Sequence, residues 1–249
     1  MIKEFAQGGF AYIPSVFQYS AGVAALRGFE IERVRFSRPV PLETGFALAE
    51  RHISDAGRPL NAFCACELRS PAPFSENGFS DFNQRYVDGI RRFGLFEEGE
   101  NQVARSTVCP EIHPPDSPFF YSFCFTRPCR DDFASFVIAG SAEAPEGTTS
   151  YIENAISAGD TSPKGLARKA QWVLGEMERR LSRFDMGWED TSSVQIYCVH
   201  DIFPLLGSEL FPRLPQGIGL EYHFNRPPVA GLEYEMDCRR VRLEILHVV

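Results

Sequence analysis

Two arginines in matching strand contexts are the residues of this 249-residue chain best suited to binding a small anion. Arg105 and Arg226 each stand at the start of a short β-type run, and a valine follows each of them three residues later. A guanidinium is a permanently charged planar fork that holds a carboxylate through two hydrogen bonds. A single arginine of this kind is commonly a surface ion pair. Two in matching contexts indicate a site for a carboxylate-bearing metabolite.

Two glutamates follow the second arginine closely in the sequence. Glu233 and Glu235 alternate with Leu232 and Tyr234, and this period of two predicts that both glutamates lie on one face of a strand. A glutamate facing a cleft could orient water and act as a general base. The alternative is a solvated strand edge, on which neither glutamate has a chemical role.

Other patterns that carry chemistry are weak in this sequence. Cys64 and Cys66 have no second pair at metal-ligand spacing, so packing is favoured and we expect no metal. His200 and Asp201 come without a nucleophile elbow, and a capping role is favoured for them. There is no phosphate-cradling glycine loop. We expect the protein to use no cofactor.

The composition sets further limits. Hydrophobic residues make up 44% and charged residues 23% of the chain, as in ordinary globular proteins, and the net charge is −8. An acidic chain without a basic cluster is a poor match for nucleic acid. No apolar run is long enough to span a membrane, and the first residues lack the apolar core of a secretory signal. These features predict a cytoplasmic protein without membrane or nucleic-acid partners.

The order of elements predicts an α+β fold. Two amphipathic helices are expected in the first half, and their apolar stripes contain Leu42, Phe46, Ala49 and Ile53, and then Phe79, Phe82, Tyr86 and Ile90. In the second half a long helix should begin at Ser162 and Pro163, which form a typical N-cap and first-turn pair. Both halves show the order strand, helix, strand, helix, strand, strand. We therefore predict two tandem units, residues 1–128 and 129–249, each a mixed β-sheet with two helices on one face.

At this point the motifs resemble those of a known family. The segments 18–21 (QYSA), 79–86 (FSDFNQRY) and 103–108 (VARSTV) are similar to the opening, the helix and the arginine strand of the Rid family, also called YjgF. In the second half, residues 232–235 (LEYE) are similar to the closing strand of the same family. The resemblance covers nearly the whole chain as two diverged copies.

The resemblance implies a chorismate-mutase-like fold and hydrolysis of a small enamine or imine to a keto acid and ammonia. It implies that Arg105 or Arg226 holds the substrate carboxylate and that Glu233 activates water. It suggests Tyr19 and Asn83 as substrate-binding residues, and we predict Thr107 and Glu235 as further ones. It also implies assembly in threes, and two units per chain make a homotrimer with six units the simplest closed ring.

The chain also departs from the family pattern. The first copy has no glutamate in its closing strand, where residues 120–123 read FYSF, and the second copy has lost the asparagine of its helix. Two alternatives therefore stay open. One is a non-catalytic protein that binds a carboxylate metabolite or serves as a scaffold. The other is a different hydrolase or lyase reaction on the same scaffold, of the barbiturase or chorismatase type.

Overall fold

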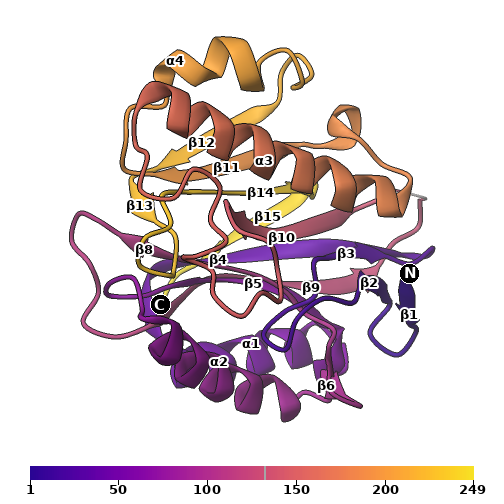
Figure 1. Ribbon diagram of the computed structural model, residues 1–249. Coiled ribbons are helices and arrows are strands. Elements are labelled where there is room, and N and C mark those ends of the chain that lie inside the picture. The colour runs from indigo at the N-terminus through magenta and orange to yellow at the C-terminus, as the bar shows by residue number, and fades with distance from the viewer. Residues whose placement is uncertain (132) are drawn as a thin grey trace.

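The protein consists of two β-sheets packed face to face, with helices on both outer faces (Figure 1). The computed structural model describes residues 1–131 and 133–249. The helices α1 (Leu42–Asp55) and α2 (Glu76–Arg91) cover one sheet, while α3 (Pro163–Leu181) and the short α4 (Phe203–Leu205) cover the other. The mixed α+β class predicted from the sequence is confirmed.

The sheet under α1 and α2 has six strands in the order β13-β8-β5-β9-β4-β15. Most of its strands come from the first half of the chain, but its two edges come from the last 25 residues. Its members are β4 (Phe29–Pro41), β5 (Phe63–Arg69), β8 (Ala104–Pro110), β9 (Phe119–Pro128), β13 (Asn225–Arg226) and β15 (Leu243–His247).

The sheet under α3 has seven strands in the order β1-β2-β3-β10-β14-β11-β12. Three of them come from the start of the chain, where β3 pairs antiparallel with β10. The members are β1 (Lys3–Phe5), β2 (Phe10–Ile13), β3 (Gly22–Ala25), β10 (Phe136–Ala142), β11 (Ser193–Cys198), β12 (Gly219–His223) and β14 (Tyr234–Arg240).

The two halves of the sequence thus contribute strands to both sheets. The predicted boundary at residue 128 falls on the connection from β9 to β10, yet β1 to β3 join the later sheet and β15 joins the earlier one. A small hairpin of β6 (Phe96–Glu97) and β7 (Glu100–Asn101) completes the strands. The division into two tandem units remains a prediction.

The helices form where the apolar periodicity of the sequence predicts them. All four stripe residues predicted for the first helix are buried on α1, and those predicted for the second are buried on α2. Ser162 caps α3, because its hydroxyl accepts a hydrogen bond from the amide of Gly165 at 3.2 Å, and Pro163 is the first helical residue. Within the described residues, no helix is long and apolar enough to cross a membrane.

The apolar cores lie between each sheet and its helices, whereas the layer between the sheets is largely polar. One core packs α1 and α2 against their sheet, and the other packs α3 against β10, β11 and β14. Between the sheets lie buried charged and polar side chains, among them Glu67, Ser106, Gln195 and Asp237. A polar layer of this kind is stable only if its members are hydrogen-bonded to one another.

Candidate active site

A cavity that is partly open to solvent lies where β8, β10 and β14 come together. Its polar lining includes Tyr19, Arg105, Thr107, Glu146, Tyr151 and Glu235. The remaining walls are mostly apolar, with Phe79, Ala142, Val229 and Leu232 among them. A concave, mostly apolar cavity with a few convergent polar groups is the usual form of a small-molecule site.

Arg105 is the cation of this cavity. Its side chain is buried, with 2% of the residue exposed, and its Nη2 donates a 2.6 Å hydrogen bond to Oδ1 of Asn83 on α2. The ring of Tyr86 lies 4.5 Å from the guanidinium carbon. Within the described part of the chain, Nε and Nη1 have no hydrogen-bond partner. Buried donors without partners are costly, and these two are placed to bind an anion that enters the cavity.

Thr107 adds a third donor beside the arginine. It lies two residues beyond Arg105 on β8, so both side chains project from the same face of the strand. Its hydroxyl oxygen is also buried and without a partner among the residues described. Arg105 and Thr107 together place buried hydrogen-bond donors beside the cavity.

Glu235 is the acid of the cavity. It projects from β14 and is 3% exposed. Burial raises its pKa well above the usual value, and the nearby charge of Asp237 adds to the effect. The shift favours the carboxylic acid form of Glu235, which can donate a proton and then act as a base.

Gly140 makes room for this carboxyl group. A methyl group built on its α-carbon would clash with Oε1 of Glu235 and would stand 3.1 Å from the hydroxyl of Ser106. The pairing of β10 with β14 shifts register between Ile138 and Ser141, so an irregularity in the strand lies beside the glutamate. The missing side chain and the irregular strand together let Glu235 face the cavity.

The opposite wall carries Glu146 and Tyr151. Glu146 is paired with Arg180 of α3, which is fully buried, and it accepts a 2.6 Å hydrogen bond from Ser15. The hydroxyl oxygen of Tyr151 accepts a 3.2 Å hydrogen bond from Nε2 of Gln18. Both residues come from the loop between β10 and α3, a segment rich in glycine, serine and threonine.

The structure brings together most of the residues predicted from the sequence. Tyr19, Arg105, Thr107 and Glu235 line the cavity, and Asn83 holds Arg105 from behind. Gly140, Glu146 and Tyr151 were not predicted. Glu146 and Tyr151 lie in an irregular loop, where no periodicity of the sequence indicates which side chains point inward, and Gly140 is significant only through its contact with Glu235.

Arg226 and Glu233 lie outside this cavity lining, in a second cluster. Nε and Nη2 of Arg226 bind the two oxygens of Glu111 at 2.7 and 3.1 Å, and Nη1 lies 3.5 Å from Glu233. Glu233 also lies 2.7 Å from Nε2 of His200. The shared strand face predicted for Glu233 and Glu235 is not observed, because Glu233 precedes the first residue of β14 and turns toward His200.

A family model and a curated relative match this chain over almost its full length. The family model described as 2-aminomuconate deaminase CnbZ matches residues 2–245. A 2-amino-5-chloromuconate deaminase from Comamonas testosteroni is 48% identical over 237 residues, which cover 94% of each chain.

The solved structures that match this chain are less similar to it. A chorismatase is 11% identical, with a TM-score of 0.48, over 93% of this chain and 77% of its own. A member of the YjgF/YER057c/UK114 family from Mycobacterium tuberculosis is 14% identical, with a TM-score of 0.29, over 47% of this chain and 83% of its own. On the match of the family model and the identity to its curated relative, the chain belongs to the 2-aminomuconate deaminase CnbZ family.

Proposed function

We propose that this protein is a deaminase that hydrolyses an aminomuconate, or a closely related unsaturated 2-amino acid, to the oxo acid and ammonia. One observation carries the proposal: a buried arginine with two unpartnered donors and a buried glutamate line the same cavity. The family and its curated relative support this class of substrate, because both are named for deamination of muconates.

In this proposal Arg105 and Thr107 bind the carboxylate next to the amino-bearing carbon. An unpartnered nitrogen of the arginine can donate to one oxygen of the carboxylate, and the threonine hydroxyl is a further donor. The apolar wall near Phe79, Val229 and Leu232 packs against the unsaturated carbon chain. Binding of this kind fixes the reacting carbons relative to Glu235, which reduces the entropic part of the barrier.

Glu235 performs the proton transfers. The carboxylic acid donates its proton to a carbon of the enamine, which becomes an iminium ion, and Glu235 is left as a carboxylate. Water then adds to the carbon of the iminium while the carboxylate takes one of its protons. Glu235 next protonates the amino group of the resulting carbinolamine. Ammonia leaves, the carbon–oxygen double bond forms, and the hydroxyl proton returns to Glu235.

The test is ammonia release from freshly prepared 2-aminomuconate, measured with the wild type and with matched pairs of variants. Arg105→Ala is compared with Arg226→Ala, and Glu235→Gln with Glu233→Gln. The proposal predicts large losses in the first member of each pair only. Turnover that survives Arg105→Ala and Glu235→Gln would contradict it. Saturable binding of the substrate without turnover by the wild type would favour the non-catalytic alternative.

We also propose that the chain is built from two Rid-like units and assembles as a homotrimer. The support is the repeated order of elements and the presence of helices on the outer face of each sheet. Light scattering combined with size-exclusion chromatography measures the assembly, and a monomer or dimer would contradict the trimer.

A further inference from the structure

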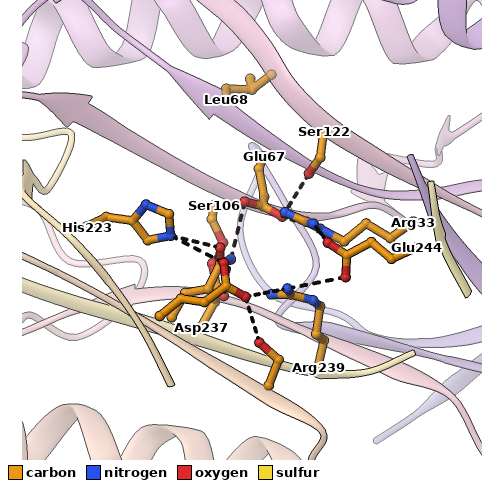
Figure 2. Close-up of polar contacts among 12 residues, drawn as sticks. Arg33, Glu67, Leu68, Ser106, Ser122, His223, Asp237, Arg239 and Glu244 are labelled. Carbon is orange, nitrogen blue, oxygen red and sulfur yellow. Dashed lines mark hydrogen bonds and ion pairs between the residues drawn. The ribbon is translucent and has the colours of Figure 1, made fainter. Parts of the chain in front are cut away.

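The layer of charged side chains between the two sheets includes Asp237, which lies on the strand that carries Glu235. Figure 2 shows Asp237 in this layer together with Ser106, Glu67, Arg33 and Arg239. Asp237 lies on β14 two residues beyond Glu235, and successive residues of a strand project to opposite sides. The two carboxyl groups therefore project from the same side of β14, separated by two strand residues, or about 7 Å.

The two carboxyl groups differ in their partners. Asp237 accepts hydrogen bonds from three neutral donors, the hydroxyl of Ser106 at 2.6 Å, the hydroxyl of Tyr197 at 2.8 Å and Nε2 of Gln195 at 2.8 Å. For Glu235, by contrast, the described contacts include no donor, and its carboxyl faces the cavity. Hydrogen bonds to a carboxylate favour its ionised form, so Asp237 is the member of the pair that gives up its proton first.

We propose that Asp237 is the positioning residue that keeps the proton on Glu235, through a buried negative charge that Ser106, Tyr197 and Gln195 stabilise. This inference rests on the proposed role of Glu235 as the acid of the reaction. Two ionised carboxylates so close together in a buried site repel each other, and Glu235 avoids the repulsion by remaining protonated.

Other charged groups face Glu235 without replacing Asp237 in this role. Glu143 is fully buried, but Lys169 pairs with it at 3.0 Å and compensates its charge. Glu146 is compensated by Arg180 in the same way. The positive charges of Arg69 and Arg180 act in the opposite direction and lower the pKa of Glu235. Further titratable groups that interact with Glu235 include Tyr19, Arg105 and Cys109.

The ionisation of Asp237 also depends on the layer behind it. Burial raises the pKa of Asp237, and so does the charge of Glu67, whereas the hydrogen bonds from Ser106 and Gln195 lower it. Glu67 is bound by Arg33 at 2.6 Å and by the hydroxyl of Ser122 at 2.7 Å. The two serines are therefore a matched pair, since each donates to one buried carboxylate but only Ser106 donates to Asp237.

The experiment measures the pH dependence of kcat/KM for 2-aminomuconate in the wild type and in Asp237→Asn. Loss of the negative charge should let Glu235 lose its proton more easily, so the alkaline limb should move to lower pH by about one unit or more. An unchanged alkaline limb in a folded, active Asp237→Asn variant would overturn the proposal.

Two further measurements keep the test decisive if that variant does not fold or if the wild type shows no turnover. Ser106→Ala should move the alkaline limb in the same direction, and Ser122→Ala should leave it in place; equal behaviour of the two serine variants would count against the proposal. Carbon-13 NMR of labelled glutamate follows the titration of Glu235 directly, with Glu235→Gln identifying its signal. That titration tests the coupling to Asp237 even if the deaminase proposal fails.

Discussion

The chain contains two clusters that pair an arginine with a glutamate. They differ in whether the hydrogen-bond donors of the arginine already have partners in the protein. At the surface, Arg226 uses both edges of its guanidinium on Glu111 and Glu233. In the cavity, Arg105 has a hydrogen bond to Asn83 and two nitrogens without a partner among the described residues. The same residue types therefore make a structural ion pair in one place and an anion site in the other, because only the buried arginine has donors left for a ligand.

The sharpest way to test this comparison is to remove the two glutamates. Glu235→Gln should lower kcat by a factor of about 10² to 10⁴, because the amide can neither donate nor accept the proton of the reaction. Glu233→Gln should stay within about threefold of the wild type, because its carboxylate lies with His200 and Arg226. Ammonia release measures both, and a larger loss in Glu233→Gln would reverse the assignment of the site.

The next largest difference in activity is expected between the variants of the two arginines. Arg105→Ala should lower kcat/KM about 10- to 100-fold, since a hydrogen bond between charged groups, worth roughly 1.5–3 kcal/mol, is lost. Arg226→Ala should leave kcat/KM nearly unchanged and reduce the free energy of unfolding by less than about 1 kcal/mol, as expected of a partly exposed ion pair. Steady-state kinetics and urea unfolding separate the two effects.

An alanine at position 140 tests the close contact between Glu235 and the neighbouring strand β10. Gly140→Ala should lower activity about tenfold or more, because the new methyl group would meet Oε1 of Glu235 and displace a positioned carboxyl group. Gly175→Ala is the matched control. Gly175 lies on the exposed side of α3 with open space around it, so the change should stabilise the protein by about 0.5–1 kcal/mol. Full activity of Gly140→Ala would show that the close contact is unimportant.

The smallest effect at neutral pH is expected at His223, which lies in the polar layer. Burial lowers the pKa of His223 from 6.5 to about 4, with the charge of Arg69 adding to the effect. The unfolded chain therefore takes up a proton before the folded one does, and stability is lost as the pH falls from about 6.5 to 4. His223→Gln should remove a loss on the order of 3 kcal/mol, as measured by unfolding at pH 4 and pH 7. His113→Gln, in an exposed loop, should not.

Part of the candidate site could be predicted from local patterns. The arginine strand, with Arg105 and Thr107 two residues apart, could be recognised in the sequence, and so could the helix that carries Asn83. Glu235 was named among the binding residues, while the role of general base was given to Glu233. The alternation of the two glutamates with apolar residues could not separate them, because the strand begins only at Tyr234.

The sequence by itself determined the elements. The apolar stripes of α1, α2 and α3, the cap at Ser162 and the runs that form β5, β8 and β11 depend on neighbours a few residues away. Such neighbours interact within a single helix or strand, so their pattern is visible in a linear sequence. The strand β15 was not predicted, because it completes a sheet whose other members lie far earlier in the chain.

Only the tertiary structure decided which of these residues meet. Ser106 bonds Asp237 across 131 positions of the chain, and Arg105 and Glu235 share a cavity across a similar separation. No periodicity fixes such contacts, since they depend on how two sheets are stacked and on where a strand departs from regular pairing. The fold buries Arg105 with donors that have no partner among the described residues, whereas Arg226 lies near the surface with its donors bound to glutamates. This difference in burial and in hydrogen-bond partners distinguishes the candidate site from an ordinary ion pair.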